Sequence, residues 1–253
     1  MKIAVKTALV TSPQIGNTKK KILNKINMDH FIIKSLINRI SKYKLFLSDK
    51  FFVASVIMGI LFLIGSLFVN YSAIKYVNKE AGNSTTDILL DNLPVVNTNI
   101  VFSGGVLLFI VFMIIIFLLE PKTIPFTLKS VALFICIRSL FVTMTHLAPS
   151  PDRIVTDLDQ FRYFSSGADL FFSGHTGMPF LMALLFWKNK YLRWIFIFSS
   201  LIAAAAVILG HLHYTIDVFS AFFITYGIYH IARKIFQKDH KLFTNGLKTN
   251  DLI

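Results

Sequence analysis

Long apolar runs alternate with short polar segments along most of the chain. A helix needs about 20 mostly apolar residues to cross the ~30 Å hydrocarbon core of a bilayer. Runs near this length predict six membrane-spanning helices, at residues 51–74, 99–119, 124–147, 170–187, 192–210 and 213–236. The expected fold class is therefore an all-α membrane protein, a bundle of six transmembrane helices.

The two ends of the chain lie outside these runs and are basic. Residues 1–50 form an N-terminal region in which Lys, Arg and Asn mix with Ile and Leu, at partly helical spacing over about 19–50. That pattern fits an interfacial amphipathic helix or a loosely ordered basic tail. Residues 51–236 are expected to form the membrane domain, and residues 237–253 a basic C-terminal tail.

Composition agrees with a membrane location, and the placement of charge adds an orientation. Hydrophobic residues make up 55% of the 253 residues, the mean hydropathy is +0.64, and the net charge is +13. Of the 26 Lys and Arg, twenty-one fall on one side of the predicted spans. Because cytoplasmic loops are rich in Lys and Arg, both termini are expected in the cytoplasm, with the plasma (inner) membrane as the expected location. The excess of positive charge is then explained by the orientation of the protein and by contact with the acidic inner leaflet. No nucleic-acid partner is expected.

Three predicted spans carry most of the polar residues, and their polar ends open on one face. The third span ends in RSLFVTMTHLAPSP (138–151), the fourth begins with DLFFSGHTG (169–177), and the sixth begins within GHLHYTIDVFSAFF (210–223). With the expected topology, all three lie at the non-cytoplasmic face. Ionisable residues at membrane depth are rare and usually functional, so the active site is expected there.

The spacing of His213 and Asp217 indicates a catalytic pair. Residues four apart at a helix start share a face. A carboxylate beside an imidazole orients the ring and stabilises its protonated or substituted form, which makes His213 the candidate nucleophile. His175, at the same depth, would protonate a leaving oxygen. The alternative for all three is a structural role in buried interhelical hydrogen bonds.

Neighbouring polar residues are candidates for holding the substrate. Arg138 could reach a phosphate or pair with a nearby Asp, Asp169 could cap a helix, bind a cationic head group or orient His175, and His211 could support the site or only an interface. The candidates for substrate or phosphate binding are Arg138, Ser173, Gly174, Asp169, Tyr214 and His211. The single cysteine, Cys136, gives no metal-ligand pattern, so neither a metal nor another cofactor is expected.

Two short motifs, DLFFSGHT and HYTIDVFSAFFIT, carry a family resemblance. They resemble the type 2 phosphatidic acid phosphatase (PAP2) superfamily, and within it the sphingomyelin synthase-like branch, whose patterns are Asp, three residues and SGHT, and HYTxDVxxAYxxT. Phe222 replaces the Tyr of the second pattern, and residues 138–151 are more loosely similar to the branch's Arg- and Thr-rich stretch. Ala206 and Val207 replace the phosphatases' Ser-Arg, which favours the synthase-like branch.

The resemblance covers about residues 85–236 and implies a PAP2-like bundle of six helices. It implies that His213 becomes a phosphohistidine, that Asp217 orients it, and that His175 acts first as acid and then as base. The implied activity is transfer of a phospho-head-group from a membrane phospholipid to a ceramide- or diacylglycerol-like lipid alcohol. The alternatives are a PAP2-type lipid phosphate phosphatase, which uses water, and a non-catalytic lipid-binding membrane protein.

Overall fold

The computed structural model describes residues 39–80, 82–156 and 169–247, and these contain helices and no strand. The chain divides into two units, residues 1–48 and 49–253. In the first unit only residues 39–48 are described, and they are helical. The rest of the expected interfacial helix lies outside the described residues.

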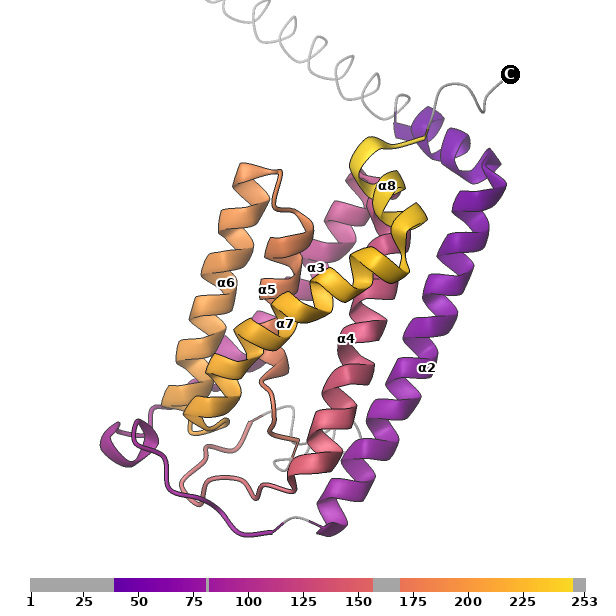
Figure 1. Ribbon diagram of the computed structural model, residues 1–253. Coiled ribbons are helices and arrows are strands. Elements are labelled where there is room, and N and C mark those ends of the chain that lie inside the picture. The colour runs from indigo at the N-terminus through magenta and orange to yellow at the C-terminus, as the bar shows by residue number, and fades with distance from the viewer. Residues whose placement is uncertain (1–38, 81, 157–168, 248–253) are drawn as a thin grey trace, which may run out of the picture. The chain divides into compact units, whose positions relative to one another are not determined.

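The described part of the second unit is a helical bundle (Figure 1). Its helices are α2 (Lys50–Glu80), α3 (Asn99–Leu119), α4 (Ile124–Thr145), α5 (Gly174–Leu185), α6 (Lys190–Leu209), α7 (Thr215–Ile235) and α8 (Gln237–Asn245). The short 3-10 helices η1 (Leu90–Asn92) and η2 (Pro121–Thr123) precede α3 and α4. Residues 237–245, expected as a basic tail, are therefore helical.

Five helices among the described residues are long and apolar enough to cross a membrane: α2, α3, α4 with η2, α6 and α7. The helix of the expected fourth span, α5, has only 12 residues, about 18 Å at 1.5 Å per residue. Ser173 caps its start, and the chain turns after Phe186 into α6. The residues before Ser173 thus build the site instead of extending the helix.

The core of the bundle lies between α4, α5 and α7. α2 packs along α4, α5 packs against both α6 and α7, and α3 lies against α6. Aromatic side chains fill the space between these helices, among them Phe134, Phe172 and Phe196, each no more than 1% exposed. α2, α3 and α6 leave many large apolar side chains exposed, as helices facing lipid do.

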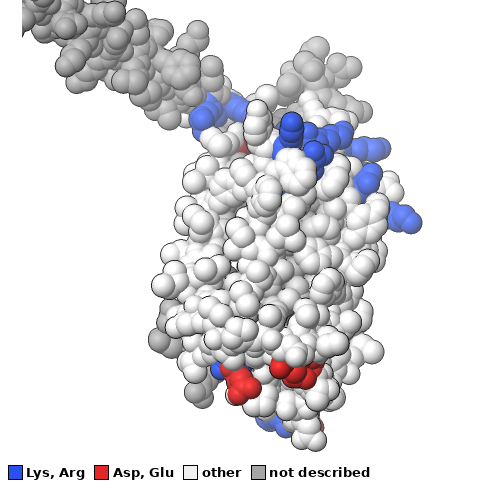
Figure 2. Space-filling view, turned by 90° about the vertical axis from the view of Figure 1, so that its left-hand side faces the viewer, with Lys and Arg blue, Asp and Glu red and all other residues white. Residues whose placement is uncertain are grey.

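The charged side chains separate along the bundle. Figure 2 shows many Lys and Arg at the end that carries α8, Asp and Glu together with a few Lys and Arg near the opposite end, and neither kind in the broad band between. The exposed basic residues at the α8 end include Lys188, Lys190, Arg233, Lys234, Lys238 and Lys241. A charge-free band with basic residues at one end is the surface expected of a bilayer-spanning protein.

Lys129, a charge inside a predicted span, is explained by a partner from α8. Its Nζ lies 2.8 Å from Asp239 Oδ2 and donates to Ser55 Oγ at 2.6 Å. The Ser55 hydroxyl in turn donates to Asp239 Oδ1. The three buried groups join α2, α4 and α8 and satisfy one another, as buried charges must.

Candidate active site

The predicted site residues lie on three helices and in the segments just before two of them, at the end of the bundle opposite α8 (Figure 1). α4 ends there, and α5 and α7 begin there. One backbone contact ties the two helix starts directly, because Ser173 N–H donates to Asp217 C=O at 3.0 Å. The SGHT and HYTID segments are therefore neighbours despite the 36 residues between them.

His213 and Asp217 form a close pair. His213 Nδ1 lies 3.5 Å from Asp217 Oδ2, at ion-pair distance and slightly long for a hydrogen bond. The same carboxylate oxygen accepts the Tyr214 backbone N–H at 3.0 Å, so the first turn of α7 fixes its direction. Both side chains are buried, and Asp217 is fully inaccessible. Nδ1 faces the carboxylate, which leaves Nε2 available as a nucleophile.

His175 faces His213 from the first turn of α5. The centroids of the two rings are 6.5 Å apart, close enough for one phosphate group to contact both. On another side the His175 ring meets Phe102 of α3, with 4.0 Å between centroids and 32° between planes. Phe102 is itself 8% exposed, so an apolar ring covers part of His175.

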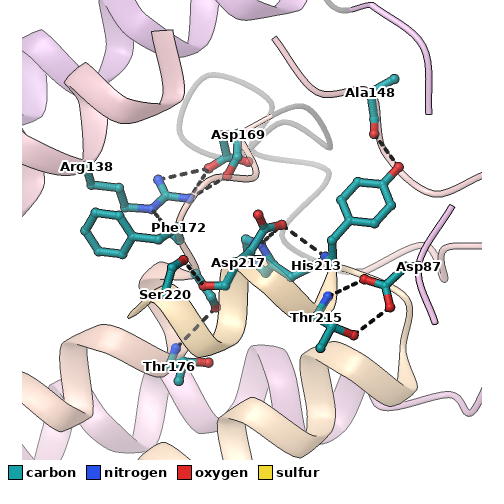
Figure 3. Close-up of polar contacts among 12 residues, drawn as sticks. Asp87, Arg138, Ala148, Asp169, Phe172, Thr176, His213, Thr215, Asp217 and Ser220 are labelled. Atoms are coloured by element: carbon teal, nitrogen blue, oxygen red, sulfur yellow. Dashed lines mark hydrogen bonds and ion pairs between the residues drawn. The ribbon is translucent and has the colours of Figure 1, made fainter. Parts of the chain in front are cut away.

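Arg138 lies beside the start of α5 and pairs with Asp169 (Figure 3). Its Nη1 and Nη2 each lie 3.3 Å from Asp169 Oδ2, Nη2 also donates to the Asp169 carbonyl, and Nε donates to the Phe172 carbonyl at 2.9 Å. Arg138 was expected either to reach a phosphate or to pair with a nearby Asp, and the structure shows the pair with Asp169. The capping interpretation of Asp169 was wrong, because Ser173 occupies the N-cap of α5.

At the start of α5, two amide groups have no acceptor among the described residues. Ser173 Oγ accepts the Thr176 N–H at 3.4 Å, and the Ser173 carbonyl accepts that of Gly177. Among the described residues, no acceptor is found for the amides of Gly174 and His175. A Cβ at Gly174 would lie 3.1 Å from Arg138 Nε, so glycine lets the guanidinium approach this helix start. Free amides beside a cation suit an anion.

Tyr214 holds two loops in place. Its hydroxyl donates to Ala148 C=O at 2.9 Å and accepts the Thr85 N–H at 3.3 Å. The ring is 2% exposed. The hydroxyl is thus engaged by the segments before α3 and after α4, and phosphate binding by Tyr214 stays a prediction.

His211 lies two residues before His213 and is also buried. It is 5% exposed, its backbone is left-handed with φ of 53°, and its Nε2 has no hydrogen-bond partner among the described residues. A non-glycine residue in this conformation is uncommon. This geometry is compatible with both interpretations of His211, as a residue that supports the site and as one that only packs at an interface.

Sequence reasoning did not single out Asp87. Its carboxylate accepts from both the backbone N–H and the hydroxyl of Thr215, each at 2.6 Å. Burial alone would raise the pKa of Asp87, but hydrogen bonds from Thr215, Leu90 and Leu89 outweigh it and hold the pKa below its ordinary value. The sequence showed acidic residues in a long loop but gave no signal of which one reaches α7.

Within the described residues, no group of three or more His, Cys, Asp or Glu is arranged to hold a metal ion. Residues 167–234 match a family model described as PAP2 superfamily C-terminal. That stretch contains His175, His213 and Asp217 and supports the PAP2 superfamily. Neither the curated proteins nor the solved structures contain a match to the chain. The PAP2 match and the apolar helices together suggest a multi-pass membrane protein of the lipid phosphatase or phosphotransferase type.

Proposed function

We propose, starting from the PAP2 match, that this protein is an integral-membrane enzyme that transfers a phospho-head-group from a phospholipid to a lipid alcohol, through a phosphohistidine. The observation that carries the proposal is the placement of His213 against Asp217, with His175 across from it at 6.5 Å. Among the described residues, His213 has a carboxylate partner and His175 has none. This difference supports two roles, a nucleophile and an acid–base.

In the first half-reaction, His213 Nε2 attacks phosphorus and the bond to the diacylglycerol oxygen breaks. His175 gives its proton to that oxygen, and diacylglycerol leaves. Asp217 stabilises the substituted imidazole through Nδ1, and its own direction is held by the Tyr214 N–H. The head group is then attached to His213 by a phosphorus–nitrogen bond.

The phosphoryl oxygens need positive partners during both steps. The amides of Gly174 and His175 and the positive end of the α5 dipole could supply them, and Arg138 lies close by, since a Cβ on Gly174 would be 3.1 Å from its Nε. Because Arg138 already bonds Asp169, it would contribute through the field it adds at the helix start, or by exchanging one of its bonds. Ser173 supports this arrangement by capping the helix.

In the second half-reaction, neutral His175 removes the proton of an acceptor hydroxyl, whose oxygen displaces His213 from phosphorus. The apolar cover of His175 by Phe102 favours a lipid alcohol over water. The similarity of the SGHT and HYTID motifs to the synthase-like branch favours the same choice. Water as the acceptor would make the protein a lipid phosphatase.

The proposed orientation places both termini in the cytoplasm and the site at the non-cytoplasmic face, in a plasma (inner) membrane. Its support is the concentration of Lys and Arg around α8 (Figure 2). A reporter fused to the C-terminus should register the cytoplasm. A reporter that registers the outside would place the site on the cytoplasmic face.

The test of function uses the purified protein in mixed micelles with labelled phosphatidylcholine, phosphatidylethanolamine or phosphatidic acid, with and without ceramide or diacylglycerol. A new labelled phospholipid that depends on the lipid alcohol is expected. Release of phosphate from phosphatidic acid alone would show a phosphatase, and no product in any arm would leave a lipid-binding protein. His213→Ala should lose at least about 10³-fold in rate. The matched control is His230→Ala, in the last turns of α7 at the other end of the bundle, and it should keep full activity.

A further inference from the structure

We infer that Asp87 is a positioning residue for the proposed reaction: through Thr215 it fixes the start of α7 and, with it, the His213–Asp217 pair. The inference rests on the proposed function for its kinetic consequence. Asp87 lies in the segment before η1, 128 residues from Thr215 in the sequence. It does not touch the reacting atoms.

At the start of α7, the helix's own Asp217 accepts the N–H of the N-cap residue Tyr214, but the next amide, that of Thr215, has its acceptor in another segment. The first amides of a helix need acceptors from outside, and Ser, Thr, Asp or Asn at the N-cap usually supplies one. Here the N-cap is Tyr214, whose hydroxyl is used by Ala148 and Thr85. Asp87 takes over this function from another part of the chain, with Oδ2 accepting the Thr215 N–H at 2.6 Å.

Asp87 binds Thr215 through both of its carboxylate oxygens, and other hydrogen bonds hold the carboxylate in place. Asp87 Oδ1 accepts the Thr215 hydroxyl at 2.6 Å, so both oxygens bind one residue (Figure 3). The same Oδ1 accepts the amides of Leu89 at 2.9 Å and Leu90 at 3.2 Å. The Asp87 N–H donates to Asp91 Oδ2 at 3.1 Å. With 9% of its surface exposed, Asp87 has little freedom to follow a shifted helix.

Thr215 stands between the two members of the catalytic pair. The residue before it, Tyr214, donates its N–H to Asp217 Oδ2, the oxygen that faces His213 Nδ1. If the first turn of α7 loosens, that amide moves and the carboxylate loses the bond that directs it. Misplacement of a reacting group by about 1 Å can lower a rate by about 100-fold. Asp87 therefore controls kcat through geometry.

The experiment compares Asp87→Asn, Thr215→Val and their double variant with wild type, in the full-length protein. Asp87→Asn keeps the shape but removes one acceptor and the charge, and Thr215→Val removes only the hydroxyl. A fall in kcat of about 10- to 100-fold is expected for Asp87→Asn, with KM changed less than about 2-fold. The double variant should be no slower than Asp87→Asn alone, because both changes break one linkage. Thr215→Ser keeps the hydroxyl that Thr215→Val lacks, so its kcat should be close to that of wild type.

Two further measurements separate the outcomes. Asp152→Asn, an exposed acid in the segment after α4, should match wild type in every assay. Hydrogen exchange at residues 215–218 needs no substrate and should accelerate in Asp87→Asn but not in Asp152→Asn. If wild type makes no product, the proposed function fails. Hydrogen exchange still tests whether Asp87 holds the start of α7 through Thr215. Unchanged exchange, or a kcat per folded molecule within 2-fold of wild type, would overturn the positioning role.

Discussion

Replacing Lys129 by Met removes one partner of the buried ion pair that ties α4 to α8. The side chains of Lys129 and Asp239 are 10% and 6% exposed, and their closest atoms are 2.8 Å apart. Removing one partner of a buried pair costs about 3–5 kcal/mol, because the other charge stays behind without compensation. Lys129→Met and Asp239→Leu should each lose about this much free energy of unfolding.

The double variant Lys129→Met/Asp239→Leu should recover most of that loss. Apolar residues of similar volume often replace a buried ion pair at little cost, and the hydroxyl of Ser55 can return to a carbonyl of its own helix. We expect the double variant to be at most about 1 kcal/mol less stable than wild type. Each single variant should melt about 6–20 °C lower, at about 2–4 °C per kcal/mol.

Thermal unfolding in detergent micelles, followed by intrinsic fluorescence, measures these shifts. The control is Lys188→Met, an exposed lysine at the same end of the bundle, which should change stability by less than about 0.5 kcal/mol. The network lies at the end of the bundle opposite His213 and Asp217, so folded Lys129→Met should keep the kcat of the proposed reaction. A Lys129→Met protein as stable as Lys188→Met, or a double variant that loses the sum of both singles, would refute the reasoning.

Two more predictions concern the site end of the bundle. In Gly177→Ala the added Cβ would lie 2.8 Å from Thr225 Oγ1 and 2.9 Å from Phe134 Cε2, so overpacking should lower stability by about 1–3 kcal/mol, measured by the same melting assay. Asp87 has a folded pKa below its unfolded value of about 3.9, so its stabilising contribution is complete above that value and is lost as the pH falls through the lower folded pKa. As the pH falls below about 4, Asp87→Asn should therefore show a shallower loss of stability than wild type; an equally steep loss would contradict this.

The positions of the long helices followed from hydropathy alone. The span predicted at 99–119 corresponds to α3 (Asn99–Leu119), and the span predicted at 213–236 corresponds to α7 (Thr215–Ile235). This agreement has a simple cause, because a backbone in hydrocarbon must satisfy its own hydrogen bonds and a helix does so within one segment. The count of six was not confirmed, since hydropathy could not separate the 12 residues of α5 from the apolar residues just before it.

The polar partners were harder to predict than the polar residues. Lys129 stood out in the sequence, but its partner Asp239 lies 110 residues later, in a segment expected to be a basic tail. Asp87 reaches Thr215 across 128 residues. Local spacing found His213 and Asp217 because one helix turn brings them together. Partners from separate segments depend on how the helices pack, which no short motif encodes.

The two polar ends of the bundle differ in how completely their titratable groups are satisfied. Lys129, Ser55 and Asp239 bond one another, as a structural network does. At the other end, buried side-chain atoms of His213, Asp217, His211 and His146 have no hydrogen-bond partner among the described residues, and these are all the titratable side chains there with such an atom. An unsatisfied buried polar group in a folded protein calls for a reason. The buried hydroxyls of Thr127 and Ser130, next to Lys129 on α4, also have no partner among the described residues, so the site end differs in that its unpaired atoms include those of titratable side chains.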